Sequence, residues 1–533
     1  MGRRRRNTFS TNTIPKIVHL PSTYNSDVNL TKTDFMRGSR CTKRMYLYKH
    51  KDKLSDVKYN SPSVTMRHLS QQGNEIGRLA ARTLFPNGTD ISKLAPALRV
   101  EKTKRCVRCC ETMYEAHFEI ENVAVACDIL VYDENSKSWD LYEVKSASKA
   151  KENYILDAAM QSHVVSKMIP IRNVHLVLID TSYENKDSNT SLTNLFKVVD
   201  ITDKIPNLTK DMDQVLKKYK SLLNQNNKDH DVKIGHHCMK PHICEFRDHC
   251  WKDLNAKIRD EPNVFDLVNG KKQSWDLYQN HNIVLQSQIP EDYTHLTKKQ
   301  KIQVDANRRG HDDVCVLDPV RLDEFLLGIE FPVCFFDVET VQMPLPRWPK
   351  TRPYEFVPFQ YSLHIQHNRD DDDDVEHYEY LHNQVDDPRR AFAESFLEHM
   401  STCTHYKTLL TYNVSFERRV LSKLAERFPD LRLDLESHIS RLKDLMIPFQ
   451  KAWCYASKME GRHSIKRVLP AFVPDLSYAN LSISNGEIAC MTYEKMLSDR
   501  KLMADPQTRD AMMRYCEMDT FAMVKLLERL NKL

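Results

Sequence analysis

Two acidic residues on one apolar strand are the strongest chemical signal in this 533-residue sequence. Asp337 and Glu339 stand two residues apart in PVCFFDVET, so alternation along the strand turns both side chains to the same side. Burying carboxylates without partners is costly, and packing alone gives a buried strand no reason to carry two of them. We therefore expect this pair to bind cations.

Two later segments carry side chains that can complete such a site. In LLTYNVSFERRVLSKL the chain is expected to leave a strand and enter a helix, which puts Asn413 and Glu417 at the junction. In MMRYCEMDTFAMVKLL, Tyr515 and Asp519 are four residues apart and so share one face of a helix. Two divalent cations held by such acids can activate water and stabilise the leaving oxygen in phosphodiester hydrolysis.

In this order the three segments resemble the DnaQ-like (DEDD) 3′–5′ exonucleases of the RNase H-like fold, in their tyrosine subtype. The resemblance covers about residues 330–533 and implies that Tyr515 orients the attacking water. It also implies that two Mg²⁺ or Mn²⁺ ions are held by four acids, Asp337, Glu339, Glu417 and Asp519. Glu417 stands where that family usually has aspartate, with the charge retained.

A string that is rich in aromatic and basic residues, PLPRWPKTRPYEFVPFQYSLH, follows the first strand. With the later GRHSIKRVLPAFVPDLSY, it resembles an uncharacterised domain family often found behind RecB-like nuclease domains. The residues that carry this resemblance are Pro344, Pro346, Arg352, Pro353, Tyr354, Pro358, Phe359 and Gln360. Aromatics interleaved with arginines can stack bases and contact phosphate, while ordinary packing explains them equally well. The substrate-binding candidates are Asn413, Arg347 and Arg352.

A second group of acids, with a lysine, lies in the first half of the chain. In VAVACDILVYDENSKSWDLYEVKS, Asp128 lies within one expected strand and a polar turn at 133–138 reverses the chain. Glu143 and Lys145 then share one face of the next strand. Carboxylates on neighbouring strands can share a divalent cation, and a lysine beside them can orient water or stabilise a pentacovalent phosphate. The alternative is a surface hairpin that carries a Glu–Lys pair.

This arrangement resembles the PD-(D/E)XK nucleases, which have a restriction-endonuclease-like fold. Gln161, on a helix expected over 154–168, matches the glutamine motif of the RecB-like members. Two positions depart from that family, because Gly77 stands where a metal-binding histidine is frequent and Val165 where a tyrosine often ends the glutamine motif. The resemblance implies a metal held by Asp128 and Glu143 and a catalytic set of Asp128, Glu143, Lys145 and Gln161.

Cysteine spacing supplies an independent argument. Cys41 precedes this module, and three cysteines follow it at six-residue steps: Cys238, Cys244 and Cys250. Thiolates are the usual ligands of iron–sulfur centres, and four of them from both ends of a module would tie its termini together. The layout resembles the iron–sulfur RecB-like exonucleases associated with CRISPR systems and implies a [4Fe-4S] cluster. Tetrahedral Zn²⁺ in the same four-cysteine site is the alternative.

Positioning all these side chains requires two α/β modules, a restriction-endonuclease-like fold followed by an RNase H-like fold. The expected organisation is a flexible basic tail (1–28), a RecB-like nuclease module (29–251), a helical connector (252–329) and a DnaQ-like exonuclease module (330–533). The clearest expected strands of the first module are 122–133, 138–146 and 173–180. Those of the second are 333–339, 357–366, 375–381 and 407–412, with helices near 415–428 and 506–532. The run Asp370–Asp374 is expected to form an exposed hairpin loop.

Composition restricts the function classes. The sequence has only 11 glycines and neither GxxxxGK[ST] nor GxGxxG, which argues against nucleotide-driven motors and dinucleotide chemistry. The net charge is +5, and four positive charges lie in Arg3–Arg6, so a nucleic-acid groove must be local. No secretion signal or membrane span is expected, and 14 cysteines then indicate a reducing compartment. The expected location is intracellular, in the cytoplasm, or in the nucleus for a eukaryotic source.

Together these patterns predict a metal-dependent nuclease that trims nucleic-acid ends. The expected partner is single-stranded or 3′-ended DNA, preferred over RNA, with no membrane. The sequence leaves protein partners and oligomeric state open. The alternative is a protein that binds nucleic-acid ends with one or both nuclease folds inactive.

Overall fold

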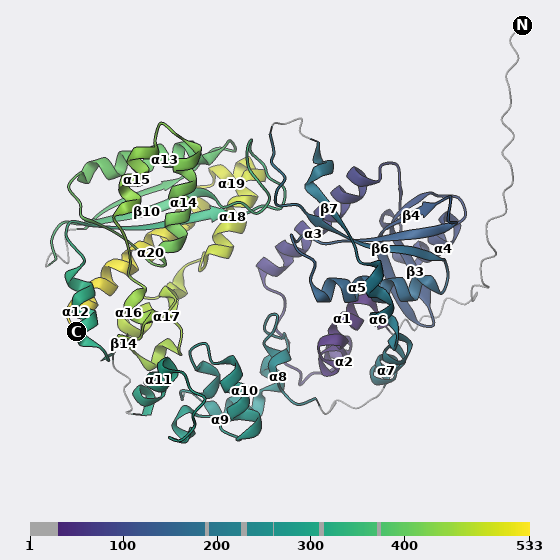
Figure 1. Cartoon of the computed structure of the whole chain (residues 1–533), viewed down its shortest axis with the longest axis horizontal. Helices are drawn as coiled ribbons and strands as arrows, with labels where there is room; N and C mark the ends of the chain where they lie inside the picture. Colours follow the sequence, from purple (N-terminus) through teal and green to yellow (C-terminus); the bar gives the residue numbers. More distant parts are fainter. Residues whose placement is uncertain (1–29, 187–190, 225–231, 260, 309–313, 370–374) are drawn as a thin grey trace, which may run out of the picture. The chain divides into compact units, whose positions relative to one another are not determined.

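The computed structural model describes residues 30–186, 191–224, 232–259, 261–308, 314–369 and 375–533 (Figure 1). The chain divides into two compact units, Met1–Cys250 and Trp251–Leu533, and each is built from helices around a mixed sheet. The α/β class expected from the sequence is confirmed. The basic tail 1–28 and the run Asp370–Asp374 lie outside the described residues.

The sheet of the first unit has seven strands in the order β2-β3-β4-β5-β6-β7, with β1 beside β4. Strands β3, β4 and β5 form an antiparallel meander, β6 runs parallel to β5, and β7 is antiparallel to β6. The bounds are β1 Leu30–Thr31, β2 Thr89–Asp90, β3 Thr112–Ile120, β4 Val123–Asp133, β5 Ser138–Val144, β6 Ile171–Ile179 and β7 Phe196–Asp200. The strands expected over 122–133, 138–146 and 173–180 are thus confirmed as β4, β5 and β6.

Several helices pack against this sheet through buried apolar side chains. On α5, the buried side chains include Ala158, Ala159 and Val165. Thr31 starts α1 with a reciprocal capping box, in which its side chain and that of Asp34 each bond the other's backbone N–H. The helices are α1 Lys32–Arg40, α2 Thr42–His50, α3 Val64–Leu84, α4 Pro96–Cys106, α5 Glu152–Ser166, α6 Ile205–Thr209, α7 Met212–Asn224 and α8 Arg247–Cys250.

The sheet of the second unit has five strands in the order β11-β10-β9-β12-β13. The first strand in sequence, β9, is central, with antiparallel β10 and β11 on one side and parallel β12 and β13 on the other. The bounds are β9 Val333–Val341, β10 Val357–Gln366, β11 Val375–Leu381, β12 Thr408–Thr411 and β13 Leu442–Asp444. A separate antiparallel pair joins β8 Cys315–Val316 to β14 Cys454–Tyr455. The strands expected over 333–339, 357–366, 375–381 and 407–412 correspond to β9, β10, β11 and β12.

Alternation along β9 assigns its side chains to two cores. Cys334, Phe336 and Val338 pack with α13 and α14 on one face, whereas Val333 and Phe335 pack with α20 on the other. The two acids of β9, Asp337 and Glu339, are also odd-numbered, so they lie on the same face of the strand as Val333 and Phe335. The helices of the unit are α9 Lys252–Ile258, α10 Lys271–Asn280, α11 Lys298–Arg308, α12 Pro319–Leu327, α13 Pro388–Met400, α14 Val414–Arg427, α15 Arg432–Ser440, α16 Ile447–Gln450, α17 Ile465–Phe472, α18 Gly486–Ser498, α19 Arg500–Ala504 and α20 Pro506–Asn531.

Residues 252–329, expected to be a connector, are part of the second unit, which begins at Trp251. They have a small apolar core of their own that includes Val264, Leu277 and Val304. They are also bonded to the segment before α17, because the Gln303 amide donates to the carbonyl oxygen of Asp266 and to the hydroxyl of Tyr455. Among the described residues, no helix is long and apolar enough to cross a membrane.

Candidate active sites

Three of the four acids expected to bind metal in the second unit meet at one point. One carboxylate oxygen from each of Asp337, Glu339 and Asp519 lies within 4.8 Å of the other two. Strand β9 supplies the first two residues, and the packing of α20 on β9 and β10 supplies the third. Three carboxylates at this separation form a constellation that can hold divalent cations.

Glu417 lies in the first turn of α14 and is almost fully buried, with 2% of its surface exposed. Among the described residues, its Oε2 atom has no hydrogen-bond partner. Burial, with nearby Asp444 and Glu339, raises the pKa of Glu417 to about 8. A buried carboxylate oxygen without a partner is expensive, and a cation bound beside it would remove that cost.

The acid cluster carries more negative charge than its surroundings balance. Burial, followed by the charges of Asp519 and Glu339, raises the pKa of Asp337 well above its usual range. Burial and Asp519 raise the pKa of Glu339 to about 8. Neighbouring carboxylates that raise each other's pKa in this way are the donor set expected of a cation site.

Tyr515 lies one helical turn before Asp519, as the sequence predicts. Burial and the charge of Asp519 raise the pKa of Tyr515, so its hydroxyl stays protonated at neutral pH. The Lys466 ammonium donates to that hydroxyl at 3.1 Å and to the carbonyl oxygen of Ser484 at 2.8 Å. Burial lowers the pKa of Lys466 even though three carboxylates lie close by.

Sequence reasoning missed Lys466 and Tyr478 as members of this site. The Tyr478 hydroxyl is 2.6 Å from Oδ1 of Asp519. Both residues stand in GRHSIKRVLPAFVPDLSY, which was noted only for a family resemblance. The sequence therefore marked this segment as noteworthy. It could not show that Lys466 and Tyr478 contact residues of α20, because that contact forms only when the chain folds.

The candidate substrate-binding residues lie near the acids in sequence and have different local roles. Asn413 is exposed, precedes α14 in a left-handed conformation with φ of 77°, and its backbone N–H donates to Asp444. Arg347 is exposed and donates to the carbonyl oxygen of Leu497 at 2.9 Å. The Arg352 side chain is also exposed. The structure therefore leaves these three residues accessible to solvent.

The four catalytic candidates of the first unit also come together. The backbone N–H of Val144 donates to Oδ2 of Asp128 at 2.7 Å, which joins β4 to β5 beside the acids. Glu143 is buried and accepts hydrogen bonds from Lys145 at 2.6 Å and from Gln161 at 2.8 Å. The surface-hairpin alternative is wrong for Glu143, because only 1% of its surface is exposed.

Two further residues belong to this cluster and were missed. The Lys32 ammonium lies 3.1 Å from Glu143 and 3.8 Å from Asp157. Asp157 also accepts from Lys145 at 2.7 Å and from Gln161 at 3.0 Å. The four-residue spacing of Asp157 and Gln161 on α5 could have identified Asp157, whereas the approach of Lys32 from α1 has no local signal.

Lysines balance the acids of the first unit. Burial favours a raised pKa for Glu143, but Lys32 and Lys145 outweigh burial and lower it to about 2. Burial and the charge of Glu143 raise the pKa of Asp128 to about 8. The first cluster is thus compensated by ammonium groups, in contrast to the cluster of the second unit.

The four predicted thiol ligands line one small cavity of the first unit, together with Lys43 and Arg44. Cys41 caps α2, and the segment 238–250 supplies Cys238, Cys244 and Cys250. The two ends of the unit are held together here, since Arg40 donates to the carbonyl oxygen of His237 at 2.8 Å and Arg44 to Glu245 at 2.9 Å. All four cysteines are free.

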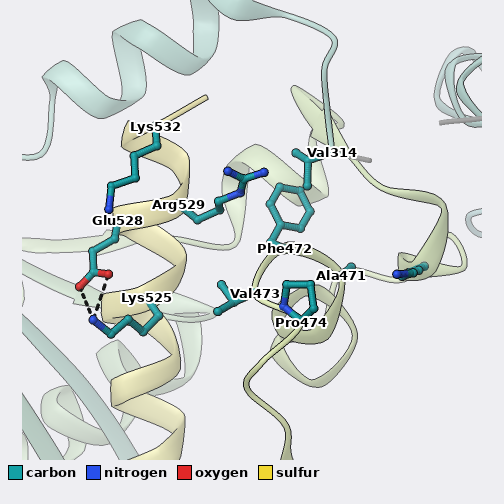
Figure 2. Close-up of a pocket in the computed structure, with 10 residues that line it drawn as sticks. Val314, Ala471, Phe472, Val473, Pro474, Lys525, Glu528, Arg529 and Lys532 are labelled. Carbon is teal, nitrogen blue, oxygen red and sulfur yellow. Dashed lines mark hydrogen bonds and ion pairs between the residues drawn. The ribbon is translucent and has the colours of Figure 1, made fainter. Parts of the chain in front are cut away.

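A larger cavity of about 380 Å³ in the second unit lies elsewhere (Figure 2). Its basic side chains include Lys525, Arg529 and Lys532 from the end of α20, and Lys525 is paired with Glu528 at 2.8 Å. Phe472, at the end of α17, forms part of the opposite wall. None of the predicted site residues lines this cavity.

Comparison with known proteins gives one family match. Residues 334–464 match a family described as a domain of unknown function, DUF2779. No curated protein matches this chain. One similar solved structure, titled "Crystal structure of SSO0001", is 11% identical, with 39% of this chain and 82% of that chain covered and a TM-score of 0.19. This likeness is too weak to bear on fold or function.

Proposed function

We propose that the second unit is a metal-dependent nuclease that trims nucleic-acid 3′ ends. The observation that carries the proposal is the meeting of Asp337, Glu339 and Asp519 within 4.8 Å, beside a buried and unpartnered oxygen of Glu417. A cluster of acids on a central strand, with Lys466 as the ammonium beside it, has no value for packing. The carboxylate oxygens of this cluster are ligands suited to two Mg²⁺ or Mn²⁺ ions.

In this proposal the side chains of the protein bind the cations and orient the attacking water and the substrate strand. When bound, the divalent cations supply a metal-activated water and stabilise the leaving 3′ oxygen. Tyr515 keeps its proton and orients the attacking water, and the Lys466 ammonium fixes the Tyr515 hydroxyl. Asn413, Arg347 and Arg352 are the candidates for contacting the strand.

The proposed substrate is single-stranded or 3′-ended DNA, in preference to RNA. The preference rests on the resemblance of the first unit to RecB-like nucleases. Purified protein with Mn²⁺ should shorten 5′-labelled single strands one nucleotide at a time from the 3′ end. A protein inert on both DNA and RNA would instead favour a role in binding nucleic-acid ends.

For the first unit, two functions compete: a second nuclease site and a platform that binds nucleic acid without cutting. The position of the Lys32 ammonium on Glu143 and Asp157 favours the platform, because it supplies the positive charge that a metal would otherwise bring. If the unit cuts, activity remaining after the second site is disabled should disappear on Asp128→Ala or Lys145→Ala. If it is a platform, no such activity remains.

We also propose that the four cysteines of the first unit bind a [4Fe-4S] cluster. The support for a cluster is the layout of the thiols, one before the module and three after it at six-residue steps, which line one cavity. A zinc ion in the same four-cysteine site is the alternative.

A further inference from the structure

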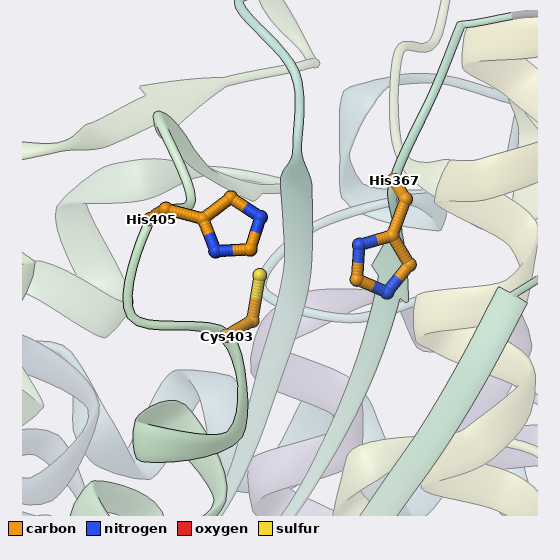
Figure 3. A group of neighbouring side chains, drawn as sticks. All are labelled: His367, Cys403 and His405. Atoms are coloured by element: carbon orange, nitrogen blue, oxygen red, sulfur yellow. The ribbon is translucent and has the colours of Figure 1, made fainter.

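A second group of ligand-type side chains lies in the second unit, outside the acid cluster. One ligand atom from each of His367, Cys403 and His405 lies within 4.8 Å of the other two. Figure 3 shows the Cys403 sulfur directed toward the space between the two imidazole rings, whose centroids are 6.4 Å apart. The three residues come from two segments that are almost 40 positions apart in the sequence.

Strand register brings these segments to the same end of the sheet. Val333, at the start of β9, pairs with both Gln366 at the end of β10 and Thr408 at the start of β12. His367 follows Gln366 directly, and His405 stands three residues before Thr408. Two rigid strands therefore fix the approach of the two histidines.

A hydrogen-bond chain prepares His367 as a ligand. Its Nε2 atom lies 3.0 Å from Oε1 of Glu376, and the Tyr378 hydroxyl donates to Oε2 of the same carboxylate at 2.7 Å. An ionised carboxylate only accepts, so a neutral His367 carries its proton on Nε2 and leaves the lone pair of Nδ1 available. Carboxylates that orient metal-binding histidines in this way are common in metal sites.

The structure assigns a transition-metal site suited to Zn²⁺ to His367, Cys403 and His405. Two imidazole nitrogens and a thiolate are ligands that zinc prefers over Mg²⁺ or Mn²⁺. His405 is exposed, so the fourth position is left to water. On binding, the Cys403 thiol releases one proton to solvent as the zinc–sulfur bond forms.

This site is structural and separate from the acid cluster. Asp337 lies four positions after Val333 on β9, which is about 13 Å along the strand. The metal would join the end of β10 to the turn before β12 at a point where β9 begins. Its presence or absence does not depend on the nuclease proposal, because metal binding is measured without any substrate.

The test compares zinc content and spectra of the full-length chain. After equilibrium dialysis against Zn²⁺, His405→Ala and Cys403→Ser should each retain one zinc fewer than wild type. His281→Ala, which removes another accessible histidine of this unit, should retain the wild-type amount. With Co²⁺ as the probe, the thiolate-to-metal absorption assigned to this site should be missing in Cys403→Ser and present in Cys41→Ser.

Because His405 is exposed, His405→Ala should fold even if Cys403→Ser does not. Added Zn²⁺ should raise the unfolding temperature of the second unit in wild type and not in His405→Ala. Equal zinc content in wild type and His405→Ala would overturn the assignment. So would a Co²⁺ spectrum unchanged by Cys403→Ser.

Discussion

The Tyr478 hydroxyl donates a hydrogen bond of 2.6 Å to Oδ1 of Asp519. Both side chains are buried, and burial together with the charge of Asp519 raises the pKa of Tyr478, so the phenol remains a donor. Asp519 therefore reaches Asp337 and Glu339 with one oxygen already oriented. This contact makes Tyr478 a positioning residue for the proposed metal site.

Replacing Tyr478 with Phe should weaken metal binding without abolishing it. Loss of such an outer partner lowers metal affinity by about 10- to 100-fold. In a Mn²⁺ titration of 3′-end trimming, the Tyr478→Phe midpoint should shift to higher concentration, with activity recovered at saturation. Tyr493→Phe is the matched control, because the buried Tyr493 hydroxyl has no partner among the described residues. An unchanged midpoint in Tyr478→Phe would contradict the positioning role.

Direct removal of a ligand should have a larger effect. Asp337→Asn and Asp519→Asn should each reduce Mn²⁺-dependent trimming of labelled single-stranded DNA by roughly 100-fold or more, since transition-state charge loses its stabilisation. Both variants should fold, because asparagine keeps the size of each side chain and removes a carboxyl group from a crowded acid cluster. Asp510→Asn, at an exposed position of α20 paired with Arg514, should trim like wild type. Full activity in both ligand variants would rule out this site.

The acid cluster also predicts how pH affects stability. Folding raises the pKa of Glu339 and Glu417 from 4.5 to about 8, so the folded unit holds more protons than the unfolded chain between these values. Stability of the metal-free second unit should therefore fall as pH rises from about 5 to 8. Chemical unfolding across this range would measure the slope. Glu417→Gln should flatten it, and a slope equal to that of wild type would argue against the buried acid.

In the first unit, Lys32→Met tests the ammonium that lies between two acids. Removing one partner of a buried ion pair costs about 3 kcal/mol, because the remaining charge is left uncompensated. Chemical unfolding should report a loss of this order for the first unit, and Mn²⁺ should partly restore stability by replacing the lysine. Lys137→Met, which breaks the exposed pair with Glu134, should have no measurable effect. Unaltered stability in Lys32→Met would refute the ion-pair account.

The cysteine cavity predicts a coloured protein. Anaerobically prepared wild type should be brown and contain iron and sulfide. Cys41→Ser should lose the colour and loosen the first unit, because metal binding energy is also folding energy when ligands join both ends of a unit. Trimming by the second unit should continue. Stoichiometric zinc without iron would replace the cluster by a zinc site, and metal retained in full by Cys41→Ser would exclude that residue as a ligand.

Strand patterns with a clear period were predictable from sequence. The alternation of PVCFFDVET placed Asp337 and Glu339 on one side of β9, and α20 begins at Pro506 as expected. Such features depend on neighbouring residues in the chain. The same holds for Asp128 and Glu143, which lie on two strands joined by a short turn, and for Lys145, which directly follows the second of these strands.

Contacts between distant segments were not predictable in this way. Lys32 reaches Glu143 across 111 positions, and no local pattern marks either residue as the other's partner. The inclusion of residues 252–329 in the second unit was not predictable for a similar reason. Their polar sequence suggested a linker, but Gln303 finds its partners only after Tyr455 and Asp266 have been brought together by folding.

The close contact between Gly461 and Asp266 limits where the chain can be cut to produce the second unit alone. The φ of Gly461 is +66°, and a Cβ atom there would lie 2.1 Å from the carbonyl oxygen of Asp266. Residues near 266 are thus in close contact with the turn that leads into α17, the helix that carries Lys466. A fragment starting at residue 330 would expose this contact surface. Expression of the second unit alone should therefore begin at Trp251.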